Sequence, residues 1–413
     1  MAIVRPFAAV RPAADKADKV LALPYDVMDR REAAEMAEGN PCSFLHISRA
    51  EIDLPEETDA YSSAVYETAA RNIETFLADG ALIQDDTPCL YIYRQVMNGR
   101  VQTGVVGCVS IDAYEDGSIR RHELTRIEKE QDRIRHFDTC NANTEPVFLT
   151  YRDDEDVRAL MDGWTRQHSP CYDFTDQRGV CHTLWVVSEA AAVEALTRAF
   201  DRVPRLYIAD GHHRSASAYH VGKLRREQHP DCSGEEDFNY FMAVIFPAGD
   251  LAIMDYNRVL ADLAGNTPQQ LFEKIRRAGF TLTDQGETPY RPSKTHEFSM
   301  YLDGRWYAMD LDPDLVPEDE IQALDVSILQ DRVLEPIFHI EDPRTDARID
   351  FVGGIRGLGE LVRRAESDMR IAFAVYPVSM EELMHIADCD KIMPPKSTWF
   401  EPKLGSGLFM HRL

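Results

Sequence analysis

Several patterns that would assign the chain to a particular class of protein are missing from its sequence. Its eight cysteines include no C-x-x-C pair, which argues against a zinc knuckle or a disulfide framework and favours reduced thiols. No apolar run approaches the length of a membrane span, and the opening MAIVRPFAAV lacks the pattern of a cleavable signal. We therefore expect a cytoplasmic protein with no membrane partner.

Basic residues are scarce relative to acidic ones. The chain has 45 Lys and Arg against 71 Asp and Glu, which gives a formal net charge of −26. This charge repels a nucleic-acid backbone, and no basic stretch is interleaved with aromatic side chains to offset it. We expect no nucleic-acid partner, although a small anionic ligand is compatible with the charge wherever local cations and N–H donors gather. The oligomeric state does not follow from composition.

What the chain does contain is the pattern of a mixed α+β protein. Its 413 residues exceed the size at which one hydrophobic core normally keeps growing. Strand-like runs, hairpin signals and helices follow one another without an internal repeat. We expect three lobes: an N-terminal α+β lobe over 1–150, a central lobe over 151–260, and a C-terminal α+β lobe over 261–413 with a docked tail.

The N-terminal part shows short local signals. A strand is expected from residue 18, followed by a turn at 24–26. A helix capped by Asp29 comes next, and a short strand in FLHI follows it.

Hairpins and one supersecondary unit are expected further along. Asn98-Gly99 and Asp303-Gly304 mark hairpins because both residues of each pair accept positive φ. HTLWVV, a helix through SEAAAVEALTRAF and the strand RLYIAD predict a β-α-β unit, which places Asp210 at the carboxyl end of its last strand.

The stretch IADGHHR at 208–214 is the first candidate site. A strand that ends in Asp-Gly and opens a helix presents backbone amides and the positive end of the helix dipole to an anion. Gly211 allows the backbone to approach closely, and Arg214 offers a planar fork to a phosphate. His212 and His213 add donors, and Asp210 is expected to hold a divalent metal or to accept a proton. The alternative is a polar helix cap whose side chains satisfy one another.

A second candidate is RRHELTRIEKEQDR at 120–133. Mixed-sign charges at three- and four-residue spacing are typical of a solvated helix face. In the functional alternative, Glu123 acts as a base or metal ligand while Arg126 or Lys129 meets an anion.

The carboxyl-terminal MPPKSTWFEPKLGSGLF is the third candidate. Lys396, Ser397 and Thr398 can donate several hydrogen bonds to a phosphate, although the upstream glycines of a Walker loop are lacking. The aromatic and leucine residues around Lys403 predict that this tail is docked. A purely structural tie-down is the alternative.

The early segment LPYDV is the fourth candidate. Pro24 and Tyr25 favour an extended turn that aims Asp26 inward as a catalytic carboxylate. The alternative is an ordinary turn residue.

Together these segments resemble one family. LPYDV, RHELT with NANTEPVF, DGHHR and MPPKSTWFEPKLGSGL look like the signature blocks of the family catalogued as domain of unknown function 1015. DGHHR is also similar to the motif of free-serine kinases built on the ParB/sulfiredoxin-like fold. The resemblance implies a ParB/sulfiredoxin-like core around that turn. It also implies phosphate transfer between a nucleotide, ATP or ADP, and L-serine or another small hydroxyl substrate, giving or consuming O-phospho-L-serine.

The match to the kinases is limited to the pentapeptide 210–214. Relatives tend to have a Pro-Thr-His-Arg block where this chain has Asp255-Tyr256-Asn257-Arg258. The histidine expected in that block is therefore missing.

The hypothesis that follows is a kinase in which Mg²⁺ bridges the nucleotide phosphates with help from Asp210. Glu123 or Asp26 would take the proton of the serine hydroxyl, and Arg126 or Arg258 would hold the serine carboxylate. Charge on the transferred group would be neutralised by His212, His213 and Arg214. The residues expected to contact the nucleotide are Gly211, Arg126, Lys129, Lys396, Ser397, Thr398 and Lys403. The alternative function is a non-catalytic protein that binds and senses a nucleotide or a phosphoamino acid through the same turn.

Overall fold

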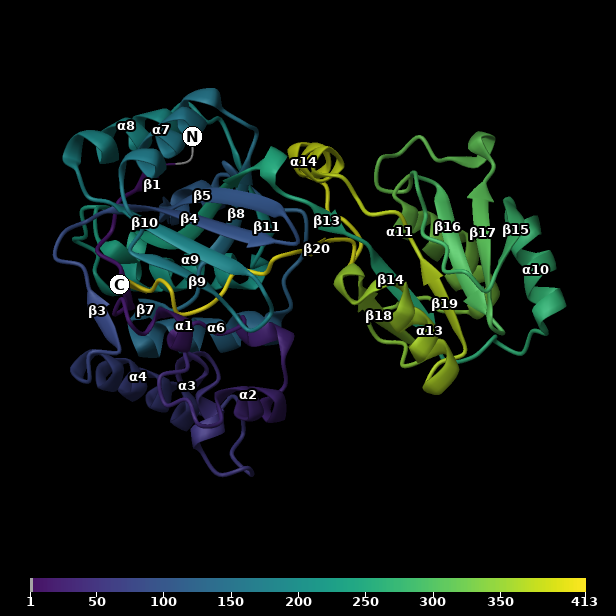
Figure 1. The fold of residues 1–413 in the computed structure, drawn as a ribbon, viewed down its shortest axis with the longest axis horizontal. Coiled ribbons are helices and arrows are strands. Elements are labelled where there is room, and N and C mark those ends of the chain that lie inside the picture. The colour runs from purple at the N-terminus through teal and green to yellow at the C-terminus, as the bar shows by residue number, and fades with distance from the viewer. Residues whose placement is uncertain (1–2) are drawn as a thin grey trace. The chain divides into compact units, whose positions relative to one another are not determined.

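The computed structural model describes residues 3–413, which form two units (Figure 1). The first unit contains the chain up to Leu251 together with the terminal Pro402–Leu413, and the second is Ala252–Glu401. Residue 150 lies within a strand of the first unit, and the change of unit falls near the boundary expected at 260. The end of the expected docked tail belongs to the first unit.

The first unit is built on a nine-stranded sheet. Its members are β1 (Val4–Arg5), β4 (Leu90–Met97), β5 (Arg100–Ser110), β6 (Ile119–Arg120), β8 (Val147–Tyr151), β9 (Tyr172–Thr175), β10 (Cys181–Val187), β11 (Leu206–Asp210) and β12 (Tyr240–Pro247). The strand order is β6-β11-β8-β12-β5-β4-β10-β9, with β1 alongside β5. Neighbours are antiparallel except for the parallel pairs β6 with β11 and β8 with β12. The segments after β6 and β11 therefore leave one edge of the sheet in the same direction.

Within residues 3–413, the first unit has nine α-helices. They are α1 (Ala17–Val20), α2 (Arg30–Ala37), α3 (Leu45–Ser48), α4 (Ser63–Ala78), α5 (Ile111–Glu115), α6 (Ile127–Cys140), α7 (Glu155–Gln167), α8 (Ala190–Phe200) and α9 (His212–Gln228). Of these, α5 to α9 share the hydrophobic core of the sheet, whereas α1 to α4 form a separate apolar cluster. Phe137, Val157, Leu196 and Val221 carry α6, α7, α8 and α9 into one core with the sheet. The short strand β21 (His411–Arg412) pairs with β7 (Ala142–Asn143), which fastens the end of the chain to this unit. A second short pair joins β2 (Val10–Pro12) and β3 (Leu82–Gln84).

The second unit contains an antiparallel six-stranded sheet. Its strands are β14 (Tyr256–Leu260), β15 (Phe280–Gly286), β16 (Glu297–Leu302), β17 (Arg305–Leu311), β18 (Ile349–Gly353) and β19 (Ile371–Ala374), in the order β15-β17-β16-β19-β14-β18. The short strands β13 (Ile253–Met254) and β20 (Trp399–Phe400) pair separately. Its helices are α10 (Pro268–Arg277), α11 (Asp325–Leu329), α12 (Glu335–Phe338), α13 (Gly357–Ser367) and α14 (Met380–Asp388).

The expected α+β class is confirmed. Both hairpins form, with Asn98 and Asp303 at a φ of 51°. The expected β-α-β elements become β10, α8 and β11, but β4, β5, β12 and β8 lie between the two strands in the sheet. The ParB/sulfiredoxin-like core stays a prediction. Within residues 3–413, no helix is both long and apolar enough to cross a membrane.

Two expected strands near the N-terminus are wrong. The run that begins at residue 18 lies in and after helix α1, and FLHI lies largely in helix α3. Such short apolar runs do not distinguish a buried strand from a buried helical turn. Tertiary packing decides here, since the N–H of Phe44 donates to the carbonyl of Val20 at 2.9 Å. The expected cap of α2 is confirmed, with Asp29 forming a capping box with Glu32.

Candidate functional site

The turn between β11 and α9 has the geometry of an anion site. Gly211 precedes the helix with a φ of +92°, a conformation that glycine adopts without strain. The Arg214 guanidinium lies against it, so that a Cβ added to Gly211 would meet Nε, Cζ and Nη2 at 3.0 to 3.2 Å. The first-turn amides of α9 point out of the helix beside this buried cation. Backbone donors and a positive charge are therefore gathered at one place.

Asp210 lies between two cations. Lys403 Nζ lies 3.8 Å from Asp210 Oδ2, and Arg214 Nη2 lies 3.4 Å from the same oxygen. Burial raises the pKa of the Asp210 carboxyl, but Lys403 and Arg214 outweigh it and hold the pKa below its usual value. The carboxylate is thus ionised at neutral pH. The terminal segment that carries Lys403 and the central turn are brought together here.

Glu145 joins three further parts of the chain. Its carboxylate accepts from the Tyr25 backbone N–H at 3.2 Å and from Ser406 Oγ at 2.7 Å. Arg133 Nη1 lies 3.7 Å from its other oxygen. Burial raises the pKa of Glu145, while Arg214 and Arg133 oppose the shift. The LPYDV, NANTEPVF and GSG blocks therefore meet around one buried carboxylate.

The two buried arginines of this site, Arg214 and Arg133, are each held by contacts with other parts of the chain. Arg214 Nη1 donates to the carbonyl of Pro146 at 2.5 Å, and within residues 3–413 its Nε has no hydrogen-bond partner. Burial lowers the pKa of Arg214, but Asp210 and other acids raise it by more. Arg133 lies over the Tyr25 ring at 4.0 Å and bonds Asp132 at 2.8 Å. The Nε–H of Arg214 is therefore a buried donor that the described residues leave without an acceptor.

His213 has a defined tautomer. Its Nε2 accepts from the backbone N–H of Arg126 at 2.9 Å. A neutral ring that accepts at Nε2 carries its proton on Nδ1. Burial lowers the pKa of His213 despite the opposing charge of Asp26. His213 is therefore a neutral ring with Nδ1–H as its donor.

Asp26 is exposed, in a 3-10 turn over Tyr25–Val27. Its carboxylate acts electrostatically on both His213 and Arg214, which brings it to the edge of the same site. The expectation that the turn aims Asp26 inward is wrong, since Asp26 is exposed to solvent. The buried side chain of this turn is that of Tyr25.

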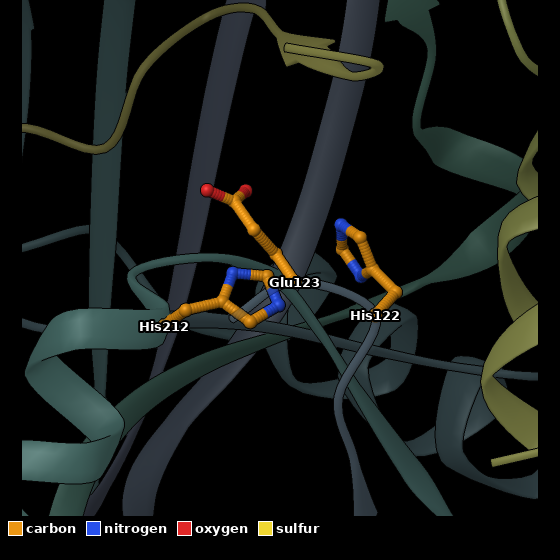
Figure 2. A group of neighbouring side chains, drawn as sticks. All are labelled: His122, Glu123 and His212. Atoms are coloured by element: carbon orange, nitrogen blue, oxygen red, sulfur yellow. The ribbon is translucent and has the colours of Figure 1, made fainter. Parts of the chain in front are cut away.

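A second group of side chains lies next to Asp210. Figure 2 shows the imidazoles of His122 and His212 on either side of the Glu123 side chain, and one ligand atom of each lies within 4.8 Å of the others. The two rings meet edge to face at 4.4 Å. Burial lowers the pKa of His122 to about 4, although Asp210 and the Ile208 backbone beside the ring oppose this. Burial also lowers the pKa of His212. Both rings are neutral at pH 7.

Other predicted residues lie away from this turn or in the second unit. Lys129 Nζ donates to Tyr61 Oη at 3.2 Å. In the second unit, Ser397 Oγ donates to the carbonyl of Pro394 at 2.6 Å, and the Lys396 carbonyl accepts from Arg258. Thr398 is half-buried in the same segment. The residues that meet in the first unit are Asp26, Glu123, Arg126, Asp210, Gly211, His212, His213, Arg214 and Lys403.

A family model described as protein of unknown function (DUF1015) matches residues 4–327. The chain belongs to the DUF1015 family. No curated protein matches the chain.

Solved structures resemble this DUF1015 chain at a distance. A free serine kinase variant in complex with AMP is 12% identical, with a TM-score of 0.38, 74% of this chain and 92% of that chain covered. A conserved hypothetical protein from Pyrococcus furiosus has 12% identity and a TM-score of 0.36, over 74% and 94% of the two chains. SbnI with a C-terminal truncation, from Staphylococcus aureus, has 11% identity and a TM-score of 0.38, over 74% and 87%.

Sequence reasoning missed the buried charges that hold the site together. Glu145 and Arg133 were not singled out, and neither was His122 as a partner of His212. Two signals could have found Glu145: it lies in the NANTEPVF block, and it is a charged residue directly before the apolar run PVFLTY. His122 lies in the RHELT block, but the local pattern did not distinguish it from its polar neighbours as a buried side chain.

Proposed function

We propose that this chain is a small-molecule kinase that transfers phosphate between a nucleotide, ATP or ADP, and the hydroxyl of free L-serine or another small alcohol. In the forward direction the hydroxyl oxygen forms a bond to phosphorus while the bond from phosphorus to the nucleotide oxygen breaks. The hydroxyl proton passes to a carboxylate of the chain. O-phospho-L-serine is the product, or the substrate when the reaction runs backwards.

The observation that carries the proposal is the gathering of Lys403, Arg214 and the first-turn amides of α9 at one turn. Phosphoryl transfer consists mainly of positioning the phosphates and stabilising their charge. The buried Nε of Arg214 and the Nδ1–H of His213 are two donors of the kind that a transferred phosphoryl group needs. The similarity of DGHHR to the motif of free-serine kinases supports the same reading.

Asp210 is the candidate ligand for Mg²⁺. Because Lys403 and Arg214 already lie beside its carboxylate, Mg²⁺ would share Asp210 with these cations and would bind only together with the negatively charged nucleotide phosphates. This fits Mg²⁺, which is usually bound through one or two carboxylates and the substrate phosphates. When bound, the ion would neutralise charge on the phosphates. The proton acceptor is Asp26 or Glu123, since both carboxylates lie beside the turn.

A coupled assay with Mg²⁺, L-serine and either ATP or ADP tests the proposal by measuring O-phosphoserine in both directions. Lys403→Met is expected to weaken nucleotide binding and to lower turnover by about 100-fold or more. Its backbone carbonyl, which accepts from Gln95 at 3.0 Å, is kept. Lys19→Met, at an exposed position on α1, is the matched control and should leave both quantities unchanged.

Asp26→Asn and Glu123→Gln separate the two candidate bases. Loss of the base should lower turnover by about 10²–10⁴-fold with little change in nucleotide affinity. Asp79→Asn, an exposed carboxylate at the end of α4, is the control. Nucleotide binding without turnover in either direction would refute the kinase and leave a nucleotide or phosphoamino-acid sensor.

A further inference from the structure

His122, Glu123 and His212 come together because of the sheet topology. His122 and Glu123 follow β6, and His212 opens α9 directly after β11. These two strands are parallel neighbours, with Ile119 opposite Leu206. The segments that follow them leave the sheet side by side, and one ligand atom of each of the three residues lies within 4.8 Å of the others (Figure 2).

The two imidazoles are buried, and several of their nitrogen atoms lack a well-formed hydrogen bond to the described part of the chain. His122 is 2% exposed and His212 is 5% exposed. Among the described residues, neither ring nitrogen of His122 nor Nε2 of His212 has a hydrogen-bond partner of ordinary geometry. Folded proteins leave few buried polar atoms in this condition, because each costs about 1–3 kcal/mol. Two such rings edge to face beside a carboxylate indicate a missing ligand.

The types of ligand atom in this group indicate which metal ion it would bind. Two imidazole nitrogens and one carboxylate oxygen are preferred by Zn²⁺ and similar divalent transition metals, whereas Mg²⁺ prefers oxygen alone. Bonds of about 2.0–2.2 Å bring ligand atoms to within about 4 Å of one another. The spacing seen here therefore needs only a small closing movement, which the long Glu123 side chain can supply.

We propose that His122, Glu123 and His212 bind a divalent transition metal of the Zn²⁺ type, next to the anion site at Asp210. Three protein ligands leave a coordination position open, as in catalytic zinc sites. The Asp210 carboxylate, which acts electrostatically on His122, offsets part of the ion's charge. The proposal does not depend on the kinase function. If it holds, Glu123 is a metal ligand and Asp26 remains as the candidate base.

A second group in the chain provides a matched control. Glu320, His385 and Cys389 also lie within 4.8 Å of one another, in the second unit. They are more exposed, and Lys391 Nζ already lies 2.9 Å from Glu320. A nearby ammonium group opposes a cation, so this group should not bind the metal tightly.

The test is metal binding by the full chain, freed of any histidine tag and stripped with a chelator, in the absence of nucleotide. One equivalent of Zn²⁺ is expected by equilibrium dialysis, and Co²⁺ should give the visible spectrum of a site with nitrogen ligands. His122→Gln and His212→Gln should each weaken Zn²⁺ binding by more than about 100-fold, since loss of outer partners alone costs about 10–100-fold. His385→Gln should have no effect.

Two results would overturn the proposal. One is no stoichiometric uptake of Zn²⁺ or Co²⁺ by the folded chain. The other is uptake of Zn²⁺ that survives both His122→Gln and His212→Gln, whatever His385→Gln does. Glu123→Gln, at a half-buried position, tests the third ligand if a histidine variant fails to fold. Because nucleotide and serine are left out, failure of the kinase assay does not affect this outcome.

Discussion

Replacing Gly211 by alanine probes the contact between the α9 turn and Arg214. The backbone has a φ of +92° here, and the new Cβ would lie 3.0 Å from Nε, 3.1 Å from Cζ and 3.2 Å from Nη2 of Arg214. The guanidinium must therefore move. It would leave the carbonyl of Pro146, to which it donates, and the carboxylate of Asp210.

The expected cost has two parts. Holding a residue with a Cβ in the left-handed region costs about 1–2 kcal/mol. Displacing a buried guanidinium from its partners adds about 1–3 kcal/mol. Gly179→Ala carries only the first part, since Gly179 has a φ of +80° and, apart from Gly179 and its two chain neighbours, no described residue lies within 4 Å of its added Cβ. We expect Gly211→Ala to cost about 2–5 kcal/mol and Gly179→Ala about 1–2 kcal/mol.

Both variants are compared by urea unfolding, with hydrogen exchange of the buried β11 amides reporting on the first unit. Nucleotide affinity is measured alongside by calorimetry. Gly211→Ala should weaken nucleotide binding by about tenfold or more, whereas Gly179→Ala should leave it unchanged. Equal losses of stability in the two variants would refute the role of the Arg214 contact. Unchanged nucleotide affinity in folded Gly211→Ala would refute the anion site at this turn.

Three further predictions concern stability. Glu145→Ala should cost about 1–3 kcal/mol in urea unfolding because it leaves the buried Tyr25 N–H and Ser406 Oγ without their acceptor. Glu145→Gln should cost less because it keeps both accepted hydrogen bonds, and equal costs would contradict this. Burial raises the pKa of Asp325 from 3.8 to about 7, so the folded state keeps a proton that the unfolded state releases. The free energy of unfolding of the second unit should therefore fall by about 4 kcal/mol as the pH rises from about 4 to 7. Asp325→Asn should remove this fall, and a pH series of unfolding in which the variant still shows it would refute the assignment to Asp325. Thr267→Ala should lower the free energy of unfolding by about 1 kcal/mol because Thr267 caps α10. Ser62→Ala should lower it little, since in the described chain Ser62 makes no side-chain cap bond to α4. Similar losses in the two variants would argue against the cap.

Local signals in the sequence predicted much of the fold. Asp29 caps its helix, and Asn98 turns its hairpin with positive φ. Each of these features depends on a few neighbouring residues, so that local chemistry decides it. The expected strand in FLHI failed because the choice between strand and helix there depends on a contact with Val20, which is distant in the sequence.

The candidate site was predictable only in part. The pentapeptide Asp210–Arg214 lies at a strand end and a helix start, and the turn between them forms as the pattern predicted. The sequence placed Lys396 with Lys403 in one terminal segment, whereas Lys396 lies in the second unit and Lys403 in the first. Nothing in the local pattern marks that division, because it depends on where the chain returns to the first sheet.

The sequence by itself determined the α+β class, the helix caps, the hairpins and an acidic chain with one conspicuous Asp-Gly-His-His-Arg turn. Only the tertiary structure decided that Glu145 accepts from Tyr25, 120 positions earlier, and from Ser406, 261 positions later. The same holds for His122 and His212, which meet because β6 and β11 are neighbours in the sheet. Burial and charge pairing depend on which distant segments pack together, and a local pattern of residues does not contain that information.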